Sequence, residues 1–323
     1  MFNRRFVLIA LLALGVGPLA GAEVVELDPA LPAYQRSAAM SGSLSAVGSD
    51  TMNNLMTLWA EGFRKHHPNL RVQVEGKGSS TAPPALIAGT AQLGPMSREM
   101  KDTELDALEQ KYGYPPTQVI TAIDVLAVYV HKDNPIPSLA LPEVDAIFSK
   151  TRKGGFPSPI TTWGQLGLKG SWMKSPLSLY GRNSASGTYG FFKEHALYKG
   201  DYKDTVKEQP GSASVVQGVN EDPSGIGYSG IGYQTSGVRA LPLSSALGGT
   251  PVEPNYENAL TRAYPLSRYL YVYTVRDPRA PMDQLTREFL RYVLSREGQA
   301  IVIKDGYLPL PVTVVEQELA KLE

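Results

Sequence analysis

The sequence contains no cysteine and only four histidines among 323 residues. Without a thiol, the chain cannot form a disulfide, a thiolate metal site, a cysteine nucleophile or a lipid-modified cysteine. His131 and His195 are isolated, and the adjacent His66 and His67 lie at a predicted helix end, where cations suit the helix dipole. These observations argue against a zinc enzyme or a serine–histidine triad. We therefore expect no catalytic residue, no metal and no cofactor.

The chain also lacks an excess of either charge and the common nucleotide motifs. Its 31 Lys and Arg residues balance 31 Asp and Glu residues, which argues against a general nucleic-acid binder. No G-x-x-x-x-G-K-[ST] loop is present, and no G-x-G-x-x-G opens a helix after a strand. A G-x-S-x-G nucleophile elbow is absent as well. We therefore do not expect a nucleotide-binding protein or an esterase.

Long apolar runs are missing except near the start of the chain. Asn3-Arg4-Arg5 precedes an apolar run over residues 6–16, and Ala20-Gly21-Ala22 follows as a small-x-small cleavage site. The run is shorter than the roughly 20 residues that span a bilayer. Residues 1–22 are therefore predicted to be a signal peptide cleaved after Ala22. We expect an exported, periplasmic protein without a membrane anchor.

The remaining chain alternates short apolar runs with helical patterns, which predicts an α/β fold. Residues 23–42 have little apolar periodicity and are interpreted as an N-terminal arm, either a linker or a loosely attached segment. Strand-like runs at Val119–Val130 and Leu266–Val275 could carry the chain out of one domain and back again. We predict a first lobe from residues 43–125 plus 268–323 and a second lobe from residues 126–267.

Three Gly/Ser/Thr-rich turns each lead into a predicted helix. They are Gly48-Ser49-Asp50-Thr51, residues 76–81 (GKGSST) and residues 182–188 (RNSASGT). A helix N-terminus carries free N–H groups and partial positive charge, so such turns can hold an anion without a basic protein. Arg182 could add a bidentate contact to a tetrahedral oxyanion. Any one turn alone is more simply read as an ordinary helix cap, whereas three together with an arginine favour an anion site.

The chain resembles periplasmic phosphate-binding proteins of phosphate ABC transporters over roughly residues 43–312. The matching stretches are VGSDTM (47–52), GKGSS (76–80), GPMSR (94–98), AIFS (146–149) with Trp163, residues 181–188, GIGY (225–228), EGQ (297–299) and GYLP (306–309). The resemblance implies a two-lobed periplasmic binding protein fold with the ligand cleft between the lobes. It also implies inorganic phosphate as ligand, a membrane permease of an ABC transporter as partner, and a monomer.

The same resemblance implies the ligand contacts. Thr51 and the Met52 amide belong to the first turn and Ser79 to the second. The third turn supplies Arg182, Ser186, Gly187 and Thr188.

Two departures from the family pattern affect the carboxylates. Arg98 stands where family members carry an aspartate implied to accept the proton of phosphate and so to reject sulfate, and Ser184 stands where they carry another. Asp50 is the nearest acidic replacement, with Asp124 and Glu99 as further candidates, although Asp50 could instead serve the helix dipole. Arg98 could be a second anion-binding cation or a surface residue. Two other functions stay open, namely an exported phosphate-scavenging or adhesion protein and a phosphoester hydrolase.

Overall fold

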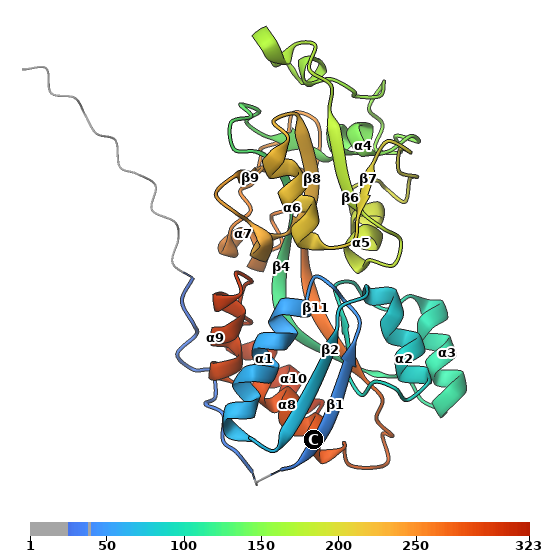
Figure 1. Ribbon diagram of the computed structural model, residues 1–323, viewed down its shortest axis with the longest axis vertical. Helices are drawn as coiled ribbons and strands as arrows, with labels where there is room; N and C mark the ends of the chain where they lie inside the picture. Colours follow the sequence, from blue (N-terminus) through green and yellow to red (C-terminus); the bar gives the residue numbers. More distant parts are fainter. Residues whose placement is uncertain (1–24, 38–39) are drawn as a thin grey trace, which may run out of the picture.

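The computed structural model describes residues 25–37 and 40–323, so the predicted signal peptide lies outside the described residues. Within these ranges no helix is long and apolar enough to cross a membrane. Helices and strands alternate along the chain and gather into two lobes, which are stacked along the long axis of the molecule (Figure 1). The predicted α/β class is confirmed.

The first lobe combines the early elements of the chain with its last helices (Figure 1). It contains β1 (Gly42–Val47), α1 (Asn53–His66), β2 (Leu70–Glu75), η1 (Ser79–Thr81), α2 (Ala82–Ile87), β3 (Gly94–Met96), α3 (Asp102–Tyr112), α8 (Gln284–Val293), α9 (Arg296–Lys304) and α10 (Val312–Ala320). The chain therefore leaves this lobe and returns to it.

The second lobe is built from the middle of the chain. It contains β5 (Leu139–Ala140), α4 (Leu141–Phe148), η2 (Trp163–Leu166), η3 (Gly170–Trp172), β6 (Ser178–Arg182), α5 (Gly187–His195), β7 (Lys207–Gln209), α6 (Ser212–Glu221), β8 (Gly225–Gly230), η4 (Ile231–Tyr233), β9 (Val238–Ala240), β10 (Leu243–Ser244) and α7 (Tyr256–Leu260).

Two long strands, β4 (Thr117–His131) and β11 (Ser267–Thr274), run between the lobes (Figure 1). The first part of β4 pairs antiparallel with β11 up to Val125, which lies opposite Ser267. From Leu126 onward its antiparallel partners are β8 and β9. The partner of β4 thus changes between Val125 and Leu126, where the sequence predicts the boundary between the lobes. One sheet, ordered β3-β11-β4-β8-β6-β7 with β9 beside β4, connects both lobes.

Helix α1 illustrates how the apolar pattern forms the core of the first lobe. Leu55, Met56, Trp59 and Phe63 recur at helical spacing, and all four are fully buried. The indole of Trp59 donates to the carbonyl of Gly298 at the start of α9. The helix ends at His66, two residues before Pro68, which cannot continue a helix.

The described part of the N-terminal arm, residues 25–37, is held to the first lobe at a few side chains. Leu31 is buried, and the Tyr34 hydroxyl donates to Glu288 at 2.8 Å and lies 2.7 Å from Nε2 of His67. Tyr34 N–H also donates to Glu297 at 2.7 Å. The expectation of a loosely attached segment is therefore wrong for these residues. Isolated anchors and hydrogen bonds hold them, and such contacts leave no periodic pattern in a sequence.

Candidate functional site

The three predicted turns converge where the lobes meet. The first follows β1, where Gly48 N–H donates to the Glu75 carbonyl and Ser49 N–H to the Pro95 carbonyl. Met52 is the N-cap residue of α1, so the N-terminal end of this helix lies directly behind Thr51, where Asn53 N–H donates to the Asp50 carbonyl. No acidic residue occupies the first turn of α1. The positive end of the helix dipole is therefore not neutralised there by a side chain of that turn.

The second turn leads into η1 and touches the opposite lobe. Ser80 N–H donates to the Ala185 carbonyl at 3.1 Å. Gly78 has φ of 110°, and a Cβ on it would lie 2.5 Å from the same carbonyl. Only glycine allows the two lobes to approach this closely at that position.

The third turn connects β6 with α5. Ser186 caps α5, and its hydroxyl accepts from the N–H groups of Thr188 and Tyr189 at 3.1 and 3.3 Å. A Cβ on Gly187 would lie 2.2 Å from Oγ of Ser79, so this backbone also rests against the second turn. The three turns, predicted separately, therefore form one cluster at the junction between the lobes.

Buried hydroxyl groups fill the centre of this cluster. Oγ1 of Thr51 and Oγ1 of Thr188 lie 2.8 Å apart across the junction. Ser79 Oγ accepts from Ser97 N–H at 3.1 Å, and the Ser49 hydroxyl donates to Ser97 at 3.1 Å. All five side chains are buried. A set of hydroxyls beside helix N-termini can donate hydrogen bonds to an oxyanion without supplying charge.

Arg182 supplies the buried cation of the cluster. Its side chain is 2% exposed and donates from Nη1 to Ser212 Oγ at 2.7 Å and from Nη2 to the Pro210 carbonyl at 3.2 Å. The Asp50 carboxylate of the first lobe lies 3.3 Å from Nη2. Nε has no partner among the described residues. Burial lowers the pKa of this guanidinium despite Asp50, and the unpaired N–H leaves donor capacity for an anion.

A second buried arginine, Arg268, lies behind the hydroxyls. Its Nη2 donates to Thr188 Oγ1 at 3.0 Å and Nη1 to the Ser97 carbonyl at 2.8 Å. Asp124 pairs with Nε and Nη2 at 2.8 and 2.7 Å, and it also accepts from Ile231 N–H. Arg268 therefore connects elements of both lobes, while Asp124 balances its charge.

The remaining candidates have their own partners. Both terminal nitrogens of Arg98 pair with Glu104 at 2.7 Å, and Nη2 also donates to Ser80. Asp50 accepts from Ser212 N–H at 2.9 Å as well as facing Arg182. Glu99 accepts from the hydroxyl of Tyr271 at 3.1 Å. Asp50 thus belongs to the cluster, whereas Arg98 is engaged by a carboxylate beside it.

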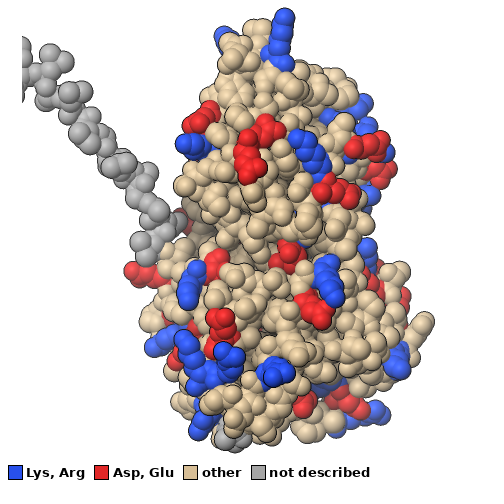
Figure 2. Space-filling model, in the orientation of Figure 1, with Lys and Arg blue, Asp and Glu red and all other residues tan. Residues whose placement is uncertain are grey.

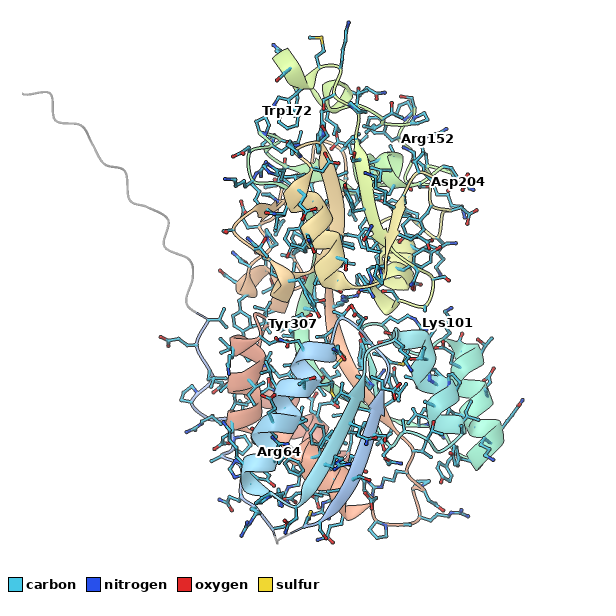
Figure 3. All side chains as sticks on the ribbon, viewed as in Figure 1. Arg64, Lys101, Arg152, Trp172, Asp204 and Tyr307 are labelled. Atoms are coloured by element: carbon cyan, nitrogen blue, oxygen red, sulfur yellow. The ribbon has the colours of Figure 1, made fainter. Side chains whose placement is uncertain are left out.

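Sequence reasoning missed Ser97, Ser212 and Arg268. Ser97 follows a three-residue strand, Ser212 opens α6, and Arg268 stands within the apolar run of β11. None belongs to a turn of the predicted design, so a local pattern could not identify them. Figure 3 shows Tyr307 where the lobes meet, and its hydroxyl donates to the Thr51 carbonyl at 2.8 Å.

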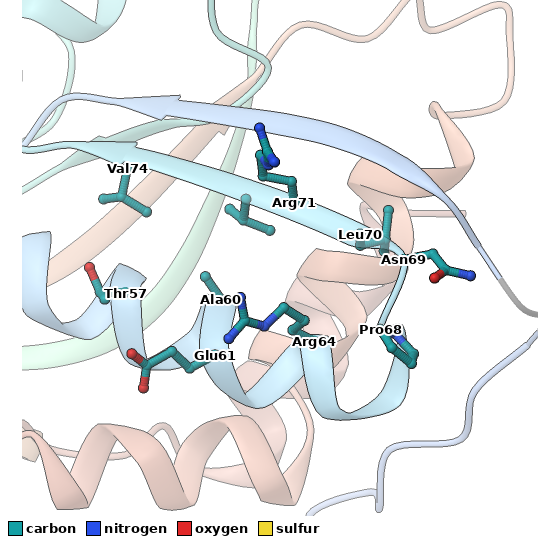
Figure 4. Close-up of a pocket in the computed structure, with 10 residues that line it drawn as sticks. Thr57, Ala60, Glu61, Arg64, Pro68, Asn69, Leu70, Arg71 and Val74 are labelled. Atoms are coloured by element: carbon teal, nitrogen blue, oxygen red, sulfur yellow. The ribbon is translucent and has the colours of Figure 1, made fainter.

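A groove on the first lobe is separate from this cluster. It lies between α1 and β2 and is shown in Figure 4. Its lining includes Thr57, Glu61, Arg64 and Arg71, with Val74 from the strand. No residue of the three turns lines it. The groove is therefore not the predicted binding cleft.

Comparisons with known proteins agree on one family. The model of the PBP superfamily domain matches residues 33–297. The phosphate-binding protein PstS of Pseudomonas aeruginosa is 56% identical over 320 residues, covering 99% of this chain and 98% of that protein. PstS of Bacillus subtilis is 28% identical over 275 residues, covering 84% and 81%.

A solved structure leads to the same family. It is that of a putative phosphate ABC transporter substrate-binding protein from Clostridium perfringens with bound phosphate. The two chains superpose with a TM-score of 0.70 at 25% identity, over 84% of this chain and 100% of that one. The fold is therefore the two-lobed fold expected from the sequence, and the chain belongs to the PBP superfamily domain family.

Proposed function

We propose that this chain is an exported solute-binding protein that captures inorganic phosphate between its lobes and delivers it to the membrane permease of an ABC transporter. The observation that carries the proposal is the buried cluster at the junction. Two lobes contribute three helix-leading turns, five buried hydroxyls and an arginine with a free Nε–H. The names of the relatives, which are phosphate-binding proteins, support the same ligand.

The proposed contacts follow from the positions of the donors. The ligand is surrounded by donors from all three turns. They are Thr51 and the Met52 amide, Ser79, and Ser186 with the amides of Gly187 and Thr188. Arg182 neutralises part of the charge of the ligand. Charged hydrogen bonds in such a buried place stabilise binding by about 1.5–3 kcal/mol each, neutral ones by about 0.5–1.5 kcal/mol. The ligand is held by hydrogen bonds rather than by a covalent bond, so we propose capture and release without chemical turnover.

Asp50 and Arg98 are proposed to act beside these contacts. Asp50 is proposed as the acceptor for the phosphate proton, because it belongs to the first turn and its carboxylate already reaches Arg182. Arg98 holds Ser80 in the second turn through Nη2, at 3.2 Å, while Glu104 balances its charge. We further propose that the protein acts in the periplasm as a monomer after cleavage behind Ala22.

Titration calorimetry of the purified chain with phosphate and with sulfate tests the function. We expect one phosphate bound per chain, tighter binding of phosphate than of sulfate, and no release of phosphate from a phosphoester. Hydrolysis of the ester, or no binding of either anion, would contradict the proposal.

Substitutions at two glycines in α5 test whether the lobes must close for the ligand to bind tightly. In Gly187→Ala the new methyl group would meet Ser79 Oγ at 2.2 Å, so the lobes cannot close fully although no donor is removed. Phosphate affinity should fall at least roughly tenfold, which corresponds to about 1.4 kcal/mol. Gly190→Ala is the matched control one turn later, where the nearest atom is the flexible Arg98 Cδ at 3.3 Å. It should bind phosphate like the unchanged chain.

A further inference from the structure

The far end of the second lobe carries a self-contained loop, residues 162–176, which we call the tip. Its ends are joined by a bridge between Thr162 and Pro176 and by the bond from Trp163 N–H to the Ser175 carbonyl at 3.0 Å. The helical turns η2 and η3 lie within it. Figure 1 shows this segment projecting beyond the rest of the lobe, and Figure 3 places Trp172 there. The tip is thus a convex, internally bonded projection.

The tip exposes apolar side chains. Met173 is 54% exposed, which is the largest value among the big hydrophobic residues of the described ranges. Trp172 is half-buried and rests edge-on against Trp163, with ring centroids 6.2 Å apart. Leu166 and Leu168 are also only partly covered. Met173 is therefore the exposed apolar residue of the tip, and the three residues beside it are partly exposed while they pack against the core.

The charged side chains within the tip itself are of one sign. No Asp or Glu occurs between Asp145 and Glu194 in the sequence. Lys169 and Lys174 flank the Trp172–Met173 pair, are exposed, and form no ion pair within the part of the chain that the structure describes. Figure 2 shows blue atoms at this extremity of the molecule. The apolar group is therefore bordered by free cations.

We propose that the tip binds the surface of a membrane that contains anionic phospholipids. Lysines beside a lipid surface attract the headgroups, while tryptophan and methionine enter the boundary between headgroups and acyl chains. The tip is a convex projection, which favours a lipid surface over an acidic protein segment. This contact is separate from phosphate capture, because no tip residue touches the cluster around Arg182.

Flotation of the purified chain with vesicles tests the proposal. Vesicles of mixed phosphatidylglycerol and phosphatidylcholine should bind the chain at low salt, and vesicles of phosphatidylcholine alone should bind it much less. Binding should weaken as salt rises, because screening reduces the attraction of the lysines. Trp172 emission should shift to the blue on binding, since Trp59 and Trp163 are fully buried and should not respond. No binding to the anionic vesicles would overturn the proposal.

Point variants distinguish vesicle binding through the tip from non-specific binding of the chain to vesicles. Met173→Asp should reduce the partition onto anionic vesicles at least tenfold, and Lys169→Gln or Lys174→Gln about fivefold each. Leu247→Asp is the matched control, because Leu247 is 51% exposed in the same lobe within an uncharged loop. It should leave the partition unchanged. All four variants should keep the phosphate affinity, which separates failure of this proposal from failure of the proposed function.

Two results would contradict the proposal that the tip binds a lipid surface. One is an equal loss for Leu247→Asp and Met173→Asp. The other is a Met173→Asp chain that binds vesicles normally but no longer supports phosphate uptake by its permease, because the tip would then contact the protein partner.

Discussion

The molecule contains two buried arginine–aspartate pairs that differ in what holds them together. Arg268 and Asp124 lie directly opposite each other on β11 and β4, and their side chains are 2% and 0% exposed. Arg182 and Asp50 come from different lobes, lie 3.3 Å apart, and Asp50 remains 24% exposed. Strand register fixes the first pair, whereas the second forms only when the lobes approach. We conclude that the first pair stabilises the fold and that the second contributes to closure of the two lobes.

The largest expected effect follows from breaking the pair on the crossing strands. Asp124→Asn leaves the Arg268 guanidinium buried without its counter-charge, so the free energy of unfolding should fall by about 3–5 kcal/mol. Urea denaturation measures this loss. Glu75→Gln, which removes an exposed pair with Lys77, should cost less than about 1 kcal/mol. A small loss for Asp124→Asn would show that register alone holds these strands.

Breaking the pair between the lobes should instead affect phosphate binding more than stability. Arg182→Ala should weaken phosphate binding by about 1.5–3 kcal/mol, while the unfolding free energy of the ligand-free chain should fall by less than it does for Asp124→Asn, because the Asp50 carboxylate stays 24% exposed. Arg239 is a part-buried arginine that donates to the carbonyls of Asn134 and Ile136, away from the cluster. Arg239→Ala should therefore lower stability and leave phosphate affinity intact. Calorimetry and urea denaturation of both variants compare the two effects.

The Asp50 carboxylate, which pairs with Arg182 between the lobes, should select between phosphate and sulfate. Phosphate near neutral pH keeps a proton that an acceptor can bind, whereas sulfate offers none and is repelled. Asp50→Asn should therefore weaken phosphate binding about tenfold, whereas sulfate binding should strengthen because the repelling charge is removed. Competition titrations at two pH values that alter phosphate protonation measure the preference. A parallel change for both anions would assign Asp50 to the helix dipole alone, with Asp124 next to be tested.

The smallest expected effect is on the pH dependence of stability, and it comes from a third aspartate, which has no arginine partner. Burial raises the pKa of Asp305 to about 6, although Asn54 donates to it. The folded chain then binds this proton more tightly than the unfolded chain, so stability rises as pH falls from about 6 to about 4. Asp305→Asn should remove about 1–2 kcal/mol of this dependence after solvent screening. Denaturation midpoints across this pH range measure it.

The control for Asp305 is an aspartate with a paired cation. Arg279 lowers the pKa of the partly exposed Asp277 to about 2. Its stability contribution is lost only below pH about 4, so Asp277→Asn should leave the slope between pH 4 and 6 unchanged. Equal slopes for the two variants would contradict the assignment to Asp305.

Much of the fold could be predicted because its signals are local. Helix α1, the strands β1 and β2 and the two crossing strands follow apolar spacing, which each segment carries within itself. Tyr271 and Tyr273 stand two residues apart, as residues on one face of a strand do, and both are buried in one cluster with Met96 and Leu108. The packing of Tyr34 was not predictable, since its partners lie more than thirty residues away or near the end of the chain.

The site was only partly predictable for a related reason. Each turn is visible as a short motif, but the carboxylate that faces Arg182 comes from Asp50, and the sequence does not show that these two meet. The family pattern suggested a carboxylate at position 184, where this chain has serine. The structure places the partner in the other lobe instead. Arg268 was missed because a lone cation in an apolar strand gives no indication of what its neighbours will be.

The shared strand β4 also determines when the protein can fold. Its first half needs β11, about 145 residues later in the chain, and Ile123 additionally pairs with Leu308. Contacts of such long sequence separation form slowly, because a large loop must close before they stabilise anything. The first lobe therefore cannot be completed while its last strand is still unsynthesised. The first lobe of a chain with this topology is completed only after its C-terminal part is made, which suits the export that we propose for this protein.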